Sequence, residues 1–232
     1  MKKDNLFFVA RPDGNVPMTA NHGLGLYYHD CRYLDGYELA MAGQAPASLS
    51  ASAVQGSVGI FTLTNPKMAL RDGTMLEKEE LGITWHRLLD SDRPALLDEL
   101  RFQNFTQRSV QFSISLTFRS AFEDLYIVRG LTTQRYGHVR EPQWHDGVLA
   151  MLYEGKDGIN RSLLIHTDPS ANEHDGTTAI FHISLGSRQH HTIRLSLLLE
   201  ESKGPQTGVR HPSHLPSFKQ HEFAIEEQAR KW

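Results

Sequence analysis

The chain has 232 residues, and its 24 basic and 27 acidic side chains give a formal net charge of −3. No overall field would therefore draw it to nucleic acid or to an anionic membrane. With 39% hydrophobic and 22% charged residues it has the composition of one folded globular domain. We see no export signal and no apolar stretch of the roughly 20 residues that a membrane span needs. A single cysteine, Cys31, excludes an internal disulfide, and together these features favour a cytoplasmic location.

Alternation of apolar and polar residues is the main pattern along the chain. It is clearest over 110–118, where every second residue is apolar, which predicts a half-buried strand. Looser alternation and short apolar runs predict further strands, in chain order over 34–41, 57–63, 83–89, 96–105, 148–153, 162–166, 178–185 and 192–197. We expect only a minority of the residues up to about residue 200 to be helical.

Asp-Gly pairs at 72–73, 146–147 and 157–158 lie between such runs and predict tight hairpin turns. Many short strands joined by hairpins are typical of antiparallel sheets with one buried face. The sequence therefore predicts an all-β fold, a large antiparallel β-sandwich of two sheets.

The composition changes after residue 200, so we expect a sandwich domain over 1–200. A stretch rich in Gly, Pro and Ser predicts a linker over 201–216, and 217–232 then reads as an amphipathic helix. This helix either packs back on the sandwich or leads toward a further domain. Its apolar face would hold Phe218, Ile225, Ala229 and Trp232.

Two ordered blocks of sequence carry a family resemblance. The first is the GLGLYYHDCRYLDGYEL stretch at 23–39, and the second combines LRFQNF at 100–105, the strand 110–118 and AFEDLYIVRG at 121–130. Together they resemble the N-terminal domain of bacterial glycogen-debranching-type proteins over at least 5–166. Cys31 stands where the family pattern has Thr, and Tyr126 stands where it has Phe.

The resemblance implies a supersandwich-like N-terminal domain that is followed by a catalytic (α/α) toroid with the acid and base for α-glucosidic hydrolysis. It implies that this chain alone is a non-catalytic accessory domain, whose partners are the missing C-terminal catalytic domain and an α-glucan such as glycogen or maltodextrin. One alternative is a stand-alone carbohydrate-binding module. Another is a mutarotase-like enzyme, which would need His166 or His182 beside an acid in a deep pocket. The oligomeric state stays open.

His29, Asp30 and Arg32 form the densest polar cluster in a segment of Leu, Tyr and Gly. One interpretation is a carbohydrate-binding or domain-interface site, because carboxylate and guanidinium groups supply directional hydrogen bonds. The interpretation that we favour is a buried Asp30–Arg32 pair that fixes the turn before strand 34–41, since an unpaired buried charge is costly.

Asp124 and Arg129 follow the strongest strand. They either point across a domain boundary or cap a corner where the chain changes sheets. Aromatic rings are platforms for sugars, and Trp144 lies in a polar turn, so it is the aromatic residue that we expect to be exposed. Most of the other candidate aromatics should lie in the core; these are Tyr27, Tyr28, Tyr33, Trp85 and Tyr136.

Neither a metal site nor a catalytic carboxylate pair is predicted. The chain has 13 histidines, but the adjacent His190 and His191 would point to opposite faces of a strand, and no grouping with Cys or carboxylates specifies zinc. Glu77, Glu79 and Glu80 lie in a charged run that predicts a solvated surface. We therefore expect no metal, no cofactor and no catalysis by this chain alone.

Overall fold

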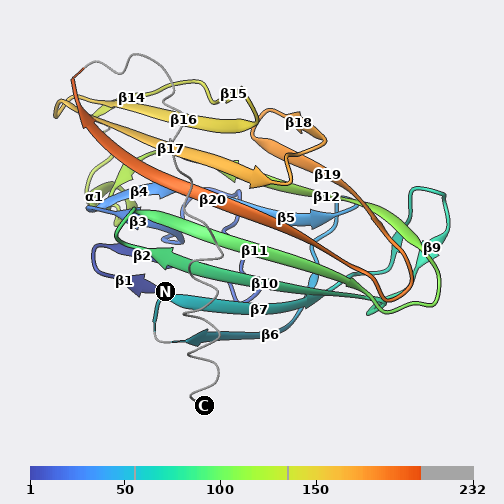
Figure 1. Ribbon diagram of the computed structural model, residues 1–232. Helices are drawn as coiled ribbons and strands as arrows, with labels where there is room; N and C mark the ends of the chain where they lie inside the picture. Colours follow the sequence, from blue (N-terminus) through green and yellow to red (C-terminus); the bar gives the residue numbers. More distant parts are fainter. Residues whose placement is uncertain (55, 135, 205–232) are drawn as a thin grey trace.

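The computed structural model describes residues 1–54, 56–134 and 136–204 as strands with one short helix (Figure 1). Nine strands form one sheet, which we call the large sheet. In spatial order its strands are β14 (Gly137–Val139), β16 (Val148–Gly155), β17 (Ile159–Asp168), β20 (His190–Lys203), β11 (Ala95–Asn104), β10 (Leu81–Asp90), β7 (Val58–Thr64) and β6 (Ala47–Val54), with β15 (Gln143–His145) also paired to β16.

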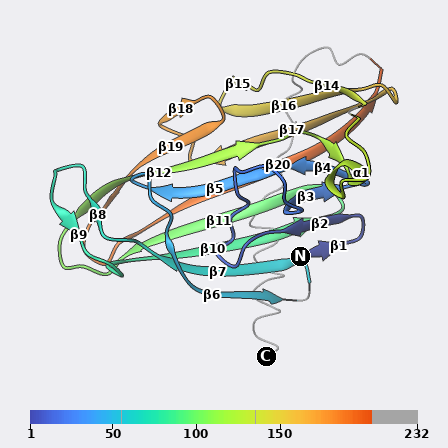
Figure 2. The ribbon, with the colours of Figure 1, turned by 180° about the vertical axis from the view of Figure 1, so that it is seen from behind.

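Two smaller sheets form the other layer. The first contains β18 (Glu173–Asp175), β19 (Thr178–Leu185), β12 (Val110–Arg119) and β5 (Gly36–Met41). The second contains β1 (Lys2–Lys3), β2 (Leu6–Val9), β3 (Gly25–Tyr28), β4 (Cys31–Leu34) and β13 (Glu123–Asp124). All three sheets contribute side chains to one main core, and Figure 2 places both smaller sheets on one side of the large sheet. The predicted all-β sandwich is confirmed, although its second layer is divided in two.

The division of the second layer follows from two short crossings between its sheets. Asp35 alone separates β4 from β5, and β12 ends at Arg119 shortly before β13. The Arg119 Nε atom donates to Asp35 Oδ2 over 3.0 Å, so one ion pair joins the two crossings.

The predicted strand rhythm and turns are present. Alternate residues of β12 from Val110 to Phe118 are buried, and the residues between them are half-buried or exposed. All three Asp-Gly pairs form hairpin turns, between β8 (Met68–Ala69) and β9 (Met75–Leu76), between β15 and β16, and between β16 and β17. Their glycines have φ values of 81°, 77° and 76°, the left-handed region that glycine adopts without strain.

A fully buried ion pair lies inside the sandwich. Arg87 of β10 and Asp98 of β11 are directly opposite each other, and both side chains are 0% exposed. Arg87 Nε and Nη2 donate to Asp98, while the Trp85 indole and the Tyr37 hydroxyl donate to the same carboxylate over 2.9 and 2.8 Å. The guanidinium also lies 4.0 Å from the centre of the Trp85 ring.

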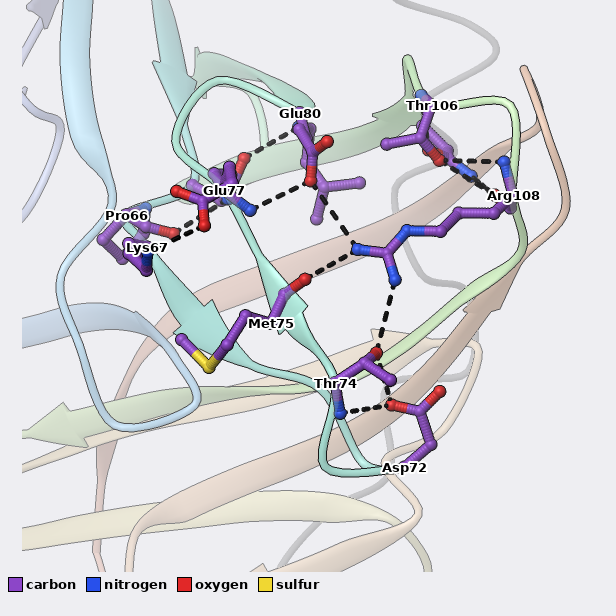
Figure 3. A network of polar contacts seen from close by, with 12 residues as sticks. Pro66, Lys67, Asp72, Thr74, Met75, Glu77, Glu80, Thr106 and Arg108 are labelled. Atoms are coloured by element: carbon purple, nitrogen blue, oxygen red, sulfur yellow. Dashed lines mark hydrogen bonds and ion pairs between the residues drawn. The ribbon is translucent and has the colours of Figure 1, made fainter.

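Exposed polar contacts hold the β8–β9 hairpin, which lies at one end of the sandwich (Figure 3). Arg108 donates to the Met75 carbonyl over 2.7 Å and lies 3.9 Å from Glu80, while Lys67 pairs with Glu77 over 2.7 Å. The charged run that contains Glu77 and Glu80 is therefore a surface that ties loops together.

The last described strand extends beyond residue 200, where we expect the sandwich domain to end. β20 continues to Lys203, so the first three residues of the expected linker belong to a strand of the large sheet. The rest of the expected linker and the expected helix over 217–232 lie outside the described residues.

Two histidines on the outer face of the large sheet lead to a prediction for pH dependence. Burial lowers the pKa of His86 and of His166 below the usual value, and it outweighs the nearby carboxylates of Glu99 and Asp168. Both histidines therefore fold as neutral groups. The stability that they contribute is full above the unfolded pKa of about 6.5 and is lost as the pH falls through the lower folded values. The urea concentration at the unfolding midpoint should therefore decrease as the pH is lowered below about 6.5.

The double variant His86→Gln and His166→Gln tests the origin of this effect. Its urea midpoint should depend less on pH between neutral and mildly acidic conditions than that of the parent chain. An unchanged pH slope would show that other groups cause the loss.

Candidate functional site

A tight hairpin begins the candidate site. His29 and Asp30 join β3 to β4, and their φ values of 45° and 61° are those of a two-residue type I′ turn. The Asp30 carbonyl accepts a hydrogen bond of 2.9 Å from the amide of Leu125, the first residue of helix α1 (Leu125–Val128). The hairpin turn is thus joined to α1, and we call this region the α1 corner.

Asp124 and Arg32 form hydrogen bonds and an ion pair that stabilise the α1 corner. The Asp124 carboxylate caps α1 by accepting from the Ile127 amide over 2.9 Å. β13 pairs with β4 so that Glu123 lies opposite Arg32, and the buried Arg32 guanidinium pairs with Glu123 and donates to the His22 carbonyl. The expected buried Asp30–Arg32 pair is therefore wrong, because Asp30 is exposed in the turn and the register brings Glu123 to Arg32.

Two distant strands complete the corner. Glu201 of β20 accepts from the Tyr33 hydroxyl over 3.1 Å and lies 3.0 Å from His29 Nδ1. Arg161 of β17 pairs with Asp157 over 3.0 Å, and its Nε atom lies 3.5 Å from Glu201. One linked set of charges thus connects the large sheet to the β3–β4 hairpin.

These elements enclose a cavity of about 270 Å³. This volume is close to the lower limit of small-molecule pockets, about 300 Å³, and suits a single sugar ring. The polar and aromatic residues that line it are His29, Asp30, Phe122, Glu123, Asp124, Tyr136, Tyr153, Asp157 and Arg161. Tyr136 is 49% exposed, so its ring is accessible to a ligand.

The structure brings together only part of the predicted site. His29, Asp30 and Asp124 line the cavity, whereas Arg32 is buried and does not line it, and Arg129 is exposed at the end of α1. Trp144 lies elsewhere. It is half-buried rather than exposed, because its ring stacks on His174 at 4.8 Å and its indole donates to the Gly176 carbonyl over 2.8 Å.

Sequence reasoning misses the contributions of Asp157, Arg161 and Glu201. The sequence marks Asp157 only as a turn residue, and nothing local distinguishes Arg161 or Glu201 from other surface charges of a strand. Their role depends on the pairing of β17 with β20 and on the approach of both strands to the hairpin. Tyr136 is among the candidate aromatics, and it is the one that stands exposed beside the cavity.

The carboxylates of the corner are arranged for structure and hydrogen bonding. Burial raises the pKa of Asp157, but hydrogen bonds from the Arg161 side chain and the Ile159 amide outweigh it, so that the pKa lies below its usual value. A general acid for glycoside hydrolysis needs the opposite shift. Glu123 and Asp124 are held by Arg32 and by the α1 amides. The arrangement suits the recognition of hydroxyl groups.

Cys31 beside the cavity gives a testable prediction. Burial raises the pKa of its thiol to about 12. Only about one part in ten thousand is thiolate at pH 8, and the thiolate is the nucleophile. N-ethylmaleimide should therefore label the folded chain slowly and the urea-unfolded chain rapidly. Equal labelling rates in the two states would contradict the buried position.

Other types of site find little support in the described residues. His182 lies 2.9 Å from Glu173 and 3.0 Å from Ser113, but these residues line neither of the two cavities that the structure describes. Residues 1–54, 56–134 and 136–204 contain no cluster of metal-ligating side chains. Within the same ranges, no helix has the length and apolar character to cross a membrane.

Comparison with solved structures finds similar chains at low sequence identity. A protein described as a kojibiose phosphorylase, from the human microbiome, has a TM-score of 0.52 and 12% identity, and the match covers 94% of this chain and 28% of that protein. A polysaccharide lyase has a TM-score of 0.41 and 11% identity, and the match covers 88% of this chain and 34% of that protein. An aldose 1-epimerase-type protein from Escherichia coli K12 has a TM-score of 0.34 and 12% identity, and the match covers 83% of this chain and 81% of that protein. No curated protein matches the sequence.

The sequence itself defines the family. A family profile described as the N-terminal domain of (some) glycogen debranching enzymes matches residues 1–196. The chain therefore belongs to this family, as the motifs at 23–39 and 100–130 predict.

Proposed function

We propose that this chain is the non-catalytic N-terminal accessory domain of a glycogen-debranching-type α-glucosidase. The domain packs against a catalytic domain that is not part of the sequence, and its α1 corner helps to bind an α-glucan. Family membership over residues 1–196 is the observation that carries the proposal.

The geometry of the α1 corner supports the glucan-binding part. The cavity has room for one sugar ring, Tyr136 offers an exposed aromatic face, and Asp30 is an exposed carboxylate in the β3–β4 turn. A sugar ring stacks its C–H face on an aromatic side chain while its hydroxyls donate to carboxylates. The chemical class that fits is therefore the terminal glucose unit of an α-glucan.

Titration with maltotriose, followed by NMR, tests this part. The parent chain should show saturable shifts for amides of the α1 corner, and Tyr136→Ala and Asp30→Ala should each weaken binding by about tenfold or more. Tyr126→Ala is a matched control, because Tyr126 is 66% exposed on α1 but does not line the cavity. Binding that is lost only with Trp144→Ala would favour a carbohydrate-binding surface elsewhere on the sandwich.

A further inference from the structure

One edge of the large sheet ends in an exposed strand. β6 is the last strand of that sheet and pairs with β7, and among residues 1–54, 56–134 and 136–204 no strand pairs with its other side (Figure 1). The first seven of its eight residues are exposed. Such an edge presents a row of backbone N–H and C=O groups that can pair with another strand. We call this side of β6 the free edge.

The other sheet edges carry features that prevent pairing between molecules. β1, β13 and β18 have two or three residues each, and each of them contains two charged side chains. At the opposite edge of the large sheet, β14 and β15 have three residues each and are separated by Arg140, Glu141 and Pro142. The free side of β5 is bridged by Val16. Short length, charge and proline are the usual protection of an edge, whereas β6 has eight residues and contains neither a charge nor a proline.

A groove of about 420 Å³ lies beside the free edge, between the large sheet and the smaller sheet that contains β2. Its lining is mostly apolar and includes Val9, Ala51, Ala53 and Phe61. Val9 is 40% exposed, and Leu49 of β6 is 60% exposed, so apolar side chains are open to solvent on both sides of the groove's entrance. A strand added to β6 would therefore bury apolar surface as well as pair backbone groups.

We propose that the free edge pairs with the β6 strand of a second copy of this chain, antiparallel about a two-fold axis. Two copies related in this way present the same surface to each other, so the contact closes as a dimer. Self-pairing places the side chains of one strand against an identical strand, and any charge would meet its like. β6 lies within residues 39–66, which contain no charged side chain, although 22% of the whole chain is charged. The charge pattern therefore fits a second copy.

The faces of β6 determine which side chains meet in this dimer. Ser50 lies opposite Thr62, which faces outward because its neighbour Phe61 points into the main core. Ser52 lies opposite Ile60, on the other side of Phe61, and faces outward as well. The bulge of β6 lies before Ser50, so the strand is regular from there to its end. Opposite residues of an antiparallel pair share a face, so these serines of the two copies lie about 5–8 Å apart.

The dimer leaves the α1 corner accessible. The free edge and β14, whose Gly137 lines the α1 cavity, are at opposite edges of the large sheet. Pairing of two copies through β6 therefore does not depend on glucan binding, and the two can be tested separately.

Sedimentation equilibrium of the full 232-residue chain tests the dimer. The parent should associate reversibly to twice its mass of 26.3 kDa. The double variant Ser50→Asp and Ser52→Asp places like charges against each other across the two-fold axis, and it should weaken the dimer at least about tenfold. Ser50→Lys with Ser52→Lys should do the same. Ser184→Asp is the matched control, because Ser184 is exposed on β19, and it should leave the association unchanged.

An equimolar mixture of the Asp and Lys double variants provides the decisive result. It should form a heterodimer, because opposite charges then face each other across β6. Both variants should keep the circular dichroism spectrum of the parent, since Ser50 and Ser52 are exposed. A parent chain that stays monomeric up to about 1 mM would overturn the proposal. A dimer that survives both charge variants would place the contact on another surface and overturn it as well, and so would a mixture that stays monomeric.

Discussion

Asp98→Ala should destabilise the chain by about 3–5 kcal/mol, the cost of removing one partner of a buried ion pair. The substitution leaves Arg87, the Trp85 indole and the Tyr37 hydroxyl without their shared acceptor, in a place with 0% exposure. Because whole domains are stable by only about 5–15 kcal/mol, this is a large fraction of the total. Urea unfolding followed by circular dichroism measures it.

Two further variants test whether the loss of stability comes from breaking the buried ion pair or from removing an acidic residue as such. Asp92→Ala, at an exposed position two residues after β10, should change the free energy of unfolding by less than about 0.5 kcal/mol. The double variant Arg87→Met and Asp98→Leu should be more stable than Asp98→Ala, since it removes both charges. A loss below about 1 kcal/mol in Asp98→Ala would contradict the buried network.

Gly25→Ala should be the second strongly destabilising substitution, by about 2–4 kcal/mol. Gly25 has φ of 142°, a conformation that side chains rarely adopt, and a Cβ atom there would lie 2.1 Å from the backbone carbonyl of Leu34. That contact cannot be relieved by a side-chain rotation, because the backbone fixes both atoms and Leu34 is paired with the neighbouring Leu26.

Gly23→Ala is the matched control for Gly25→Ala. It lies two residues earlier in the same motif, and apart from its chain neighbours no atom lies within 4 Å of the position that a Cβ atom would take there. Thermal unfolding of both variants should leave Gly23→Ala near the parent and lower the midpoint of Gly25→Ala by many degrees. Similar midpoints for the two variants would mean that the hairpin tolerates a side chain at Gly25.

The fold is predictable because its strongest signals are local. The alternation over 110–118 and the three Asp-Gly turns depend only on neighbouring residues, and each is present in the structure. Strand β6 escapes prediction because its sequence, ASLSASAV, alternates Ser with small or single apolar residues, a weak signal for burial, and the strand is exposed along almost its whole length. The split of the second layer escapes prediction because it depends on Asp35 and Arg119, which are 84 residues apart.

The site is predictable only where it lies on one stretch of chain. The motif containing His29 and Asp30, and the later Asp124, belong to the corner, but their partners depend on strand register. Arg32 pairs with Glu123 rather than Asp30 for this reason. A usable signal for the buried ion pair does exist, because Arg87 and Asp98 occupy apolar-face positions of two adjacent predicted strands.

An assay of α-1,6-glucosidase activity with the purified chain tests the central claim most directly. The proposal predicts no release of glucose from a branched α-glucan, together with binding of maltotriose at the α1 corner. Glucose release that persists through purification and is abolished by a carboxylate variant such as Asp30→Asn or Asp157→Asn would contradict the non-catalytic role.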